Sequence, residues 1–442
     1  MNKNSIKNIL MILFLILSSC SFIPRIATGP IPEVEPVNPD ALVSYRYYHV
    51  DNTHPDASDS NPGTAKKPWL TIQHAADTAG PGDTVFVHEG LYPERVAVNN
   101  SGSSAKYLVF KAVGIAEIRG FQLYGNCIGV IGFTILDDIG ISGWLGSGVW
   151  VSGNYQYIAD NTIKEFINSN GIMGTWGKYS KNIHIKGNYF YRCNAGICIN
   201  GENWLVEDNE IERLYRGPDG GDADYFRFFG KNNIIRRNIM HGTIEAEIGV
   251  SHVDLFQTFD NNGEIAHDIL VEKNIGIGMY HQGLMLSGSH QSMRNIIFRE
   301  NVFAGGSSWG FCIYGTGGVH ILNNTIFGIE FHGIGFNDAA RGVVKNNIIA
   351  YCTTSYWADG YAVVESGYNI IWQCRDDPGI YSSTDMIGVD PLFNLAEKPD
   401  PITLSDILGP DGIAFTADDG LALRKYSPAN GTGEDGQNIG AY

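Results

Sequence analysis

Side chains able to transfer protons or bind ions gather in one stretch of the sequence, between residues 216 and 282. Carboxylates at short spacing can hold a hard cation through oxygen or act as an acid and base pair. Histidine transfers protons near neutral pH, and arginine and glutamine can bind polar ligands. The residues that we expect to perform catalysis, to bind substrate or to hold a metal ion here are Asp222, Asp224, Tyr225, Arg227, His252, Asp254, Gln257, His281 and Gln282.

A recurring asparagine predicts the element that must position these residues. It follows a short β-rich run and precedes an apolar residue, at steps of 27, 21, 29, 36, 27, 23, 23 and 22 residues. A period of this size indicates one supersecondary unit per turn of a stacked solenoid, and strand-sized runs favour β over helical repeats. We expect the asparagines to form a hydrogen-bonded ladder and to tolerate left-handed backbone. They are Asn161, Asn188, Asn209, Asn238, Asn274, Asn301, Asn324, Asn347 and Asn369.

A second strand precedes each asparagine and carries the candidate residues. Its third and fifth positions are mostly apolar and should point inward, so the fourth should point outward. The long step from Asn238 to Asn274 predicts a loop insertion on the working face. In order along the chain, the outward positions are Trp150, Met173, Cys198, Arg227, Gln257, Met285, Cys312 and Gly335. The group therefore should lie on one exposed side of consecutive turns, with Trp150 three turns away as a further substrate-binding residue.

Composition and charge limit the function classes. The formal net charge of −17 argues against a nucleic-acid partner, because phosphate binding needs an excess of lysine and arginine. Charged residues make up 17 % of the chain, and 54 glycines suit an all-β solenoid with many tight turns. We expect a monomer.

The two ends of the chain differ from the repeats. Lys3 and Lys7 precede a short apolar run that ends in Leu-Ser-Ser-Cys at Cys20, which is similar to the lipobox of bacterial lipoproteins. This predicts a lipoprotein signal over residues 1–20 with acylation at Cys20, and localisation in the cell envelope, anchored in the outer membrane. The proline-rich residues 21–44 are expected to be a flexible tether.

The predicted β-helix spans residues 45–395. Within it, the segment LTIQHAADTA (residues 70–79) places Leu70, Ile72 and three alanines near one helical face, which predicts a capping helix over the first turn. Residues 396–442 are expected to cap the other end, so that no sheet edge is exposed.

The N-terminal hundred residues carry a family resemblance. The stretch YYHVDNTHPDASDSNPGTAKKPWLTIQHAADTAGPGDTVFVHEGLYPERV, followed by SGSSAKYLVFKAVG, resembles the opening of pectate-lyase-like proteins. These include family 9 polysaccharide lyases and β-helical glycoside hydrolases. The resemblance implies an all-β fold, a right-handed parallel β-helix with an N-terminal capping helix, and a polysaccharide as partner.

The resemblance also implies a mechanism. In family 9 lyases, acids on neighbouring turns bind Ca²⁺, which neutralises a uronate carboxylate before β-elimination; the matching positions are Asp222, Asp224 and Asp254. The family's lysine base has no counterpart, so His252, His281 or Arg227 would be the base. Two alternatives stay open: a glycoside hydrolase with Asp224 and Asp254 as its carboxylate pair, and a non-catalytic carbohydrate-binding surface protein.

Overall fold

The computed structural model describes residues 29–137, 140, 143–177, 180–216, 220–288, 292–375 and 381–442. The expected signal segment with Cys20 lies outside the described residues, as do residues 21–28 of the expected tether. In the described part of the chain, no helix is both long and apolar enough to cross a bilayer.

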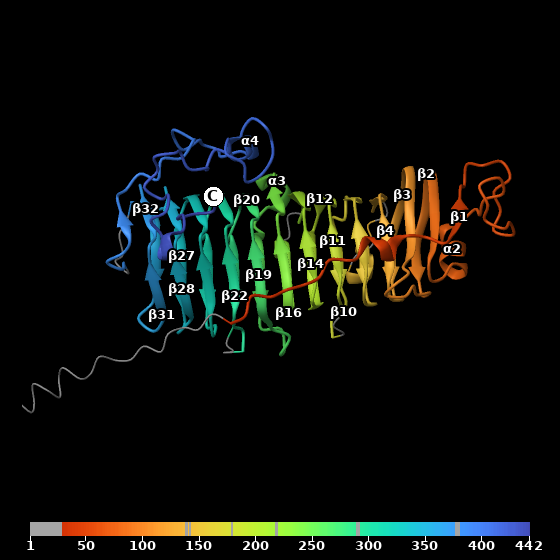
Figure 1. Cartoon of the computed structure of the whole chain (residues 1–442), viewed down its shortest axis with the longest axis horizontal. Coiled ribbons are helices and arrows are strands. Elements are labelled where there is room, and N and C mark those ends of the chain that lie inside the picture. Colours follow the sequence, from red (N-terminus) through yellow and green to blue (C-terminus); the bar gives the residue numbers. More distant parts are fainter. Residues whose placement is uncertain are drawn as a thin grey trace, which may run out of the picture.

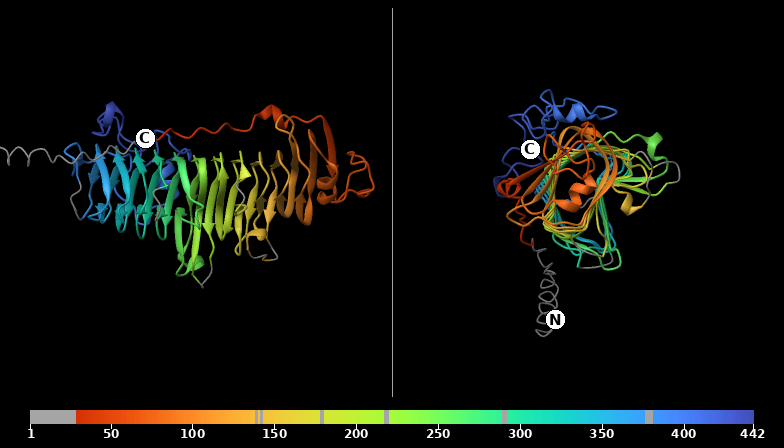
Figure 2. Two further views of the ribbon diagram at one scale, coloured as in Figure 1. Left: turned by 90° about the horizontal axis from the view of Figure 1, so that it is seen from below. Right: turned by 90° about the vertical axis from the view of Figure 1, so that its right-hand side faces the viewer.

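The chain forms a parallel β-solenoid (Figure 1), in which each turn contributes strands to three stacked faces, seen end-on in Figure 2, right. Sheet 1 contains β1 (Arg46–Val50), the first parts of β2 (Asp83–Val98) and β3 (Leu108–Leu123), β4 (Ile128–Ile131), β7 (Tyr157–Ala159), β11 (His184–Lys186), β14 (Leu205–Glu207), the last part of β16 (Asp222–Arg236), β19 (Ala266–Glu272), β22 (Ile296–Arg299), β25 (Val319–Leu322), β28 (Arg341–Lys345) and β31 (Val363–Gly367).

Sheet 2 contains β5 (Thr134–Leu136), β8 (Thr162–Lys164), β12 (Tyr189–Cys193), β15 (Glu210–Leu214), β17 (Ile239–His241), β20 (Ile275–Met279), β23 (Val302–Gly306), β26 (Thr325–Ile329), β29 (Ile348–Ala350), β32 (Ile370–Trp372) and β33 (Met386–Ile387). Sheet 3 contains the last parts of β2 and β3, β6 (Val149–Val151), β9 (Asn170–Gly174), β13 (Ala195–Glu202) with β10 (Ser180–Lys181) beside its end, the first part of β16, β18 (His252–Phe259), β21 (Leu284–Ser287), β24 (Phe311–Tyr314), β27 (His332–Asn337) and β30 (Thr354–Ala358). The helices are α2 (Ile72–Thr78), α3 (Glu245–Ile248) and α4 (Leu404–Leu408), with 3-10 turns at Pro39–Leu42, Trp144–Gly146 and Glu434–Gly436.

The register predicted for sheet 3 is confirmed. Cys198 pairs with Arg227, Arg227 with Gln257, and Gln257 with Met285, so the outward positions of successive turns stack as expected. The inward positions stack as well: the rings of Phe226 and Phe256 lie 5.4 Å apart and nearly parallel. Burial of such rings along the axis supplies the apolar core that each turn shares with its neighbours.

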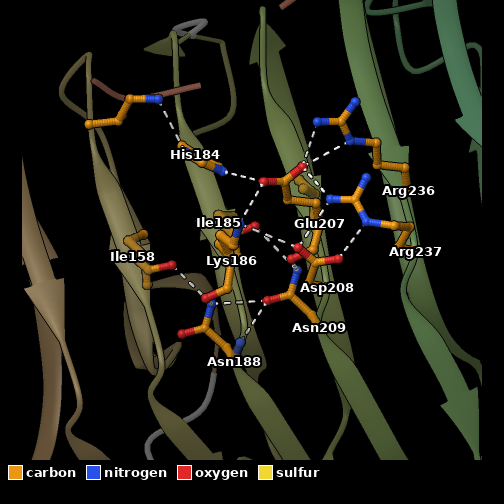
Figure 3. A network of polar contacts seen from close by, with 12 residues as sticks. Ile158, His184, Ile185, Lys186, Asn188, Glu207, Asp208, Asn209, Arg236 and Arg237 are labelled. Carbon is orange, nitrogen blue, oxygen red and sulfur yellow. Dashed lines mark hydrogen bonds and ion pairs between the residues drawn. The ribbon is translucent and has the colours of Figure 1, made fainter. Parts of the chain in front are cut away.

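The asparagine ladder is also confirmed, between sheets 1 and 2 (Figure 3). The backbone N–H and side-chain amide of Asn188 both donate to Oδ1 of Asn209, at 2.9 and 3.0 Å, and the pattern repeats on later turns. The left-handed backbone falls on the residue before each asparagine, such as Asp208 (φ 58°), rather than on the asparagine. At the last turn Asp385 takes over the acceptor role for Asn369.

The predicted capping helix is α2, which covers the opening of the first turn (Figure 2, right). Thr71 caps its N-terminus, and Ile72, Ala75, Ala76 and Ala79 are buried. Leu70 was expected on the same face, but it precedes the helix and is exposed.

The expected tether is in part a docked segment. Residues 29–44, which we call the strap, lie along the outside of sheet 1 (Figure 1). Asn295 donates to the carbonyl of Pro30, and the N–H of Val37 donates to Nδ1 of His184. Val34 packs on an outward apolar patch of sheet 1, and burial of that patch explains why this part is not free.

The C-terminal segment does not cap the end of the solenoid, contrary to expectation. It turns back and packs along the flank of sheet 2, with α4 above the middle turns (Figure 1). The outward side chains there are apolar, including Ile275, Val302 and Ile348, and the segment buries them with Ile407, Leu421 and Ile439. An apolar outer face, rather than an open end, is what this segment covers.

Candidate functional site

The candidate residues meet on the outer side of sheet 3, on consecutive turns. Asp222 pairs with His252 and Asp224 with Asp254 across β16 and β18. The next turn follows directly, because the backbone N–H of Gln282 donates to Oδ1 of Asp254 at 2.8 Å. The grouping predicted from the repeat is therefore present as one surface.

The insertion between β17 and β18 is held in place just before β18 begins. It contains α3, whose Glu247 binds Arg192 at 2.9 Å and Arg213 at 2.6 Å. The N–H of His252 then donates to the carbonyl of Gly221, which joins the two turns at the edge of the site. The predicted insertion thus borders the site and is held by ion pairs.

Arg227 and Asp224 form the first unit of the site. Nε of Arg227 donates to Oδ2 of Asp224 at 2.8 Å, and its terminal nitrogen contacts the same oxygen and lies 3.5 Å from Asp222. Burial, with the nearby Asp254 and Asp222 carboxylates, raises the pKa of Asp224 to about 8 against the opposing effect of Arg227. Oδ1 of Asp224 is buried and has no hydrogen-bond partner among the residues that the structure describes.

Asp254 and His281 form the second unit. Nδ1 of His281 lies 3.5 Å from Oδ1 of Asp254, and Gln257 donates to Oδ2 of Asp254 at 3.3 Å. The His281 ring stacks on His252, with centroids 4.0 Å apart and planes at 18°. A buried carboxylate thus lies close to Nδ1 of the histidine without a hydrogen bond between them, while Nε2 lies 3.4 Å from the side-chain nitrogen of Gln282. A carboxylate in this place can act on a histidine base through its charge.

Exposure divides the residues into two layers. The side chains of His252, Asp222, His281 and Arg227 are 59 %, 46 %, 30 % and 24 % exposed, whereas those of Asp224 and Asp254 are 0 % and 1 % exposed. A ligand on this surface meets the two histidines, the arginine and Asp222. The two buried carboxylates act on it through Arg227 and His281.

Four residues were expected to bind substrate. Tyr225 instead points into the core, where its hydroxyl contacts Thr243 Oγ1 at 2.6 Å. Simple alternation fails here, because the consecutive residues Tyr225 and Phe226 are both fully buried. Gln257 and Gln282 are close to the site but nearly buried, and each keeps a buried amide oxygen without a partner.

Trp150 holds the outward register position that was expected for it, on the third turn before Arg227. Its ring lies 6.4 Å from that of Tyr124, and its N–H donates to Thr175. Phe259 was missed: the Arg227 guanidinium lies 5.7 Å from its ring centroid. Two-residue alternation from Gln257 would have placed Phe259 on the same outer face.

The residues do not fit the calcium site that the family resemblance implies. Asp222, Asp224 and Asp254 do not bring one oxygen each to within 4.8 Å of one another. The Arg227 guanidinium already contacts Asp222 and Asp224, so a positive charge stands where the ion would be needed. The positive charge of Arg227 balances the negative charge of these carboxylates, as a bound ion would otherwise do.

Comparison with known proteins agrees with the fold. The model for the right-handed β-helix region matches residues 261–387, and an LVIVD repeat model matches residues 146–163. The chain is 25 % identical over 381 residues to the uncharacterized protein YwoF of Bacillus subtilis (strain 168), a match that covers 78 % of this chain and 72 % of YwoF.

Solved structures share the architecture at low identity. A tailspike protein of E. coli bacteriophage HK620 matches with a TM-score of 0.53 and 12 % identity, over 82 % of this chain and 71 % of the tailspike chain. Pectate lyase Pel9A matches with a TM-score of 0.39 and 15 % identity, over 91 % and 97 % of the two chains. The strand stacking, the match to the right-handed β-helix region and the likeness to the tailspike together identify the fold of the chain as a right-handed parallel β-helix.

Proposed function

We propose that this protein cleaves a uronic-acid-containing polysaccharide by β-elimination on the outer side of sheet 3. One observation carries the proposal: the partly exposed Arg227 and His281 each lie against a buried carboxylate. These two carboxylates, Asp224 and Asp254, are on adjacent turns at the same strand position. The sequence resemblance of the N-terminal hundred residues to pectate-lyase-like proteins supports the same class of substrate.

Arg227 supplies the charge for the first step. Its guanidinium binds the carboxylate attached to C5 of the uronate, which withdraws charge and makes the C5 proton more acidic. The raised pKa of Asp224 favours its neutral form, which leaves more of the arginine's charge for the substrate. Phe259 lies against the guanidinium and limits its movement.

The histidines carry the proton transfers. With Nδ1 on the side of Asp254, His281 uses Nε2 as the base that removes the C5 proton, and the Gln282 amide nitrogen, 3.4 Å from Nε2, gives way to the substrate. The electron pair of the C5–H bond forms the C4–C5 double bond, and the C4–O bond breaks. The departing oxygen takes a proton from His252, which stacks on His281.

A glycoside hydrolase is the second candidate, and the raised pKa of Asp224 favours it. An acid that keeps its proton near neutral pH beside a second carboxylate is the pairing that glycoside hydrolysis uses. In that case Asp224 and Asp254 would have to contact the sugar directly, so their covering side chains would have to move aside.

A substrate panel tests the proposal. Purified protein is incubated with polygalacturonate, alginate and glycosaminoglycans, and with neutral xylan as a control. We expect new ultraviolet absorbance from an unsaturated uronate; reducing ends without that absorbance would replace the lyase by the hydrolase. Binding without any cleavage would favour a carbohydrate-binding protein. Activity that needs added Ca²⁺ and is lost with a chelator would contradict the arginine-based scheme.

A matched pair of variants assigns the base. His281→Gln should lower turnover by about 100-fold or more, since general base catalysis contributes factors of this order. His267→Gln is the control, because His267 faces Asp268 at 2.7 Å on β19, away from sheet 3. Equal losses of turnover in the two variants would mean that His281 does not act as the catalytic base.

We also propose that the chain is exported and acylated at Cys20, as its lipobox-like segment suggests. Cys20→Ser should move the protein from the detergent phase to the aqueous phase in a partition experiment on whole cells. Unchanged partition would contradict the lipid anchor.

A further inference from the structure

The outer side of sheet 3 changes from polar to aromatic directly beyond the candidate site. The strand position of Asp224 and Asp254 is occupied on the following turns by Gln282, Trp309 and His332. The turns are joined without a gap, because the N–H of Gly283 donates to the carbonyl of Trp309. Trp309 therefore lies two turns from Asp254, about 10 Å at the usual strand spacing.

Four rings form a contiguous surface there, which we call the platform: Trp309, Phe331, His332 and Trp357. The Trp309 centroid lies 4.3 Å from that of His332, 5.5 Å from Phe331 and 6.2 Å from Trp357. His332 in turn contacts Phe331 at 3.9 Å and stacks towards Trp357 at 5.8 Å. Each ring thus limits the movement of its neighbours.

A glycine allows the Trp309 indole to lie against the sheet. Gly335 holds the outward position between Cys312 and Trp357, where other turns carry a side chain. A Cβ built on Gly335 would lie 1.9 Å from Cζ3 of Trp309, closer than any real contact. The residue at this position therefore determines whether the platform can form.

The platform remains open to solvent. Phe331 is 44 % exposed, and Trp309 and Trp357 are only partly buried. His332 itself is buried beneath the other rings, and this burial lowers its pKa. Rigid, neutral and partly exposed aromatic faces are unusual on a protein surface unless they bind an apolar face of a ligand.

We propose that the platform is a binding subsite that stacks a pyranose ring of the same glycan chain whose bond is broken at Arg227 and His281. One C–H face of the sugar would pack against a single indole ring, because the planes of Trp309 and Trp357 stand at 88° to each other. The glycan would run along the solenoid axis over sheet 3 towards β30. The inference rests on the proposed function for its ligand, and the commitment to a glycan follows from direct continuity with the site.

The test measures binding separately from turnover. Size-graded oligogalacturonates and oligoalginates are titrated by calorimetry into the full chain carrying His281→Gln, which binds without cleaving. The platform is then changed by Trp309→Ala or Gly335→Ala, with Trp372→Ala on sheet 2 as the control. Trp309→Phe keeps an aromatic face and should restore most of the affinity.

The expected result depends on chain length. Oligosaccharides long enough to reach the platform should bind about 10-fold more weakly to Trp309→Ala, and the shortest ones should bind unchanged. Against cleavable polymer, the same substitution without His281→Gln should raise KM and leave kcat unaltered. Circular dichroism is used to check that each variant is folded. If Gly335→Ala does not fold, the result for Trp309→Ala alone tests the platform.

The two proposals can fail separately. Length-independent binding, or equal losses for Trp309→Ala and Trp372→Ala, would overturn the platform while leaving cleavage intact. Binding that depends on Trp309 without cleavage of any polymer would overturn the lyase and leave the platform standing.

Discussion

Two buried carboxylates on different faces of this solenoid have opposite surroundings. Glu207, on sheet 1, accepts from His184, Lys186, Arg236 and Arg237 at 2.8 to 3.3 Å (Figure 3). Asp224, on sheet 3, has one oxygen on Arg227, and its other oxygen has no partner in the described part of the chain. Both lie on outward positions and are almost fully covered.

The pKa values follow these surroundings. Burial would raise the pKa of Glu207, but hydrogen bonds from His184 and Arg236 and their charges hold it well below its usual range. Burial dominates at Asp224 and raises its pKa to about 8. A fully satisfied charge network joins turns together, whereas an unsatisfied one stays able to interact with a ligand. The difference separates a structural network from a candidate active site.

Removal of the Glu207 side chain is expected to lower the stability of the protein more than any other change proposed here. Glu207→Ala leaves three basic side chains and His184 without their shared partner, and should lower the free energy of unfolding by about 3 to 5 kcal/mol. Urea unfolding measures it, with activity per folded molecule unchanged. Glu272→Ala is the control, since among the described residues the Glu272 carboxylate pairs with Arg299 alone and its removal should cost less. Equal losses of unfolding free energy in Glu207→Ala and Glu272→Ala would mean that the network around Glu207 is no more stabilising than a single ion pair.

Asp254→Asn should show the opposite profile. The amide keeps the shape of the side chain but cannot orient and charge-stabilise His281, so turnover should fall by about 100-fold. The melting temperature should change little, because the apolar core holds this turn. Asp268→Asn, beside His267, is the matched control. A large loss of stability in Asp254→Asn with normal turnover would make this carboxylate structural.

The two acids should also give stability slopes of opposite sign with pH. The folded chain keeps the Asp224 proton that the unfolded chain releases, so this group lowers the free energy of unfolding as pH rises from about 4 to about 8. Glu207, with a lowered pKa, stabilises above about pH 4.5 and loses that contribution as pH falls. Asp224→Asn should flatten the first slope and Glu207→Gln the second, measured by urea unfolding across this range. Slopes that are the same in each variant as in the unchanged protein would contradict the assignments.

The repeat pattern was enough to predict the strand register, but it could not predict which outward side chains are buried by their neighbours. Period-two alternation placed Arg227 and Gln257 on one outward row correctly, because strand pairing on sheet 3 runs without slips along this row. It could not show that Asp254 is buried, since its cover comes from Gln282 and His281 on the next turn. Tyr225 was misplaced because two consecutive residues face the core.

The ends were predicted less well for a similar reason. The helical face at Ile72 and Ala75 is visible in the local sequence, so α2 was found. The C-terminal segment and the strap are positioned by apolar patches on distant turns, such as Ile275 and Leu270, and no local pattern records that match.

The strap changes how the molecule would respond to a pull on its N-terminal end. Its first anchored residue, Pro30, is bonded to Asn295 beside β22, while Ala41 accepts from Tyr107 near the first turns. A force applied to the N-terminal end of the strap would act first on the turn that contains β22. It would then pull the strap along the surface of sheet 1. Helix α2 and the first turn would bear the force only after those contacts had been broken, so the strap shields this end of the solenoid mechanically.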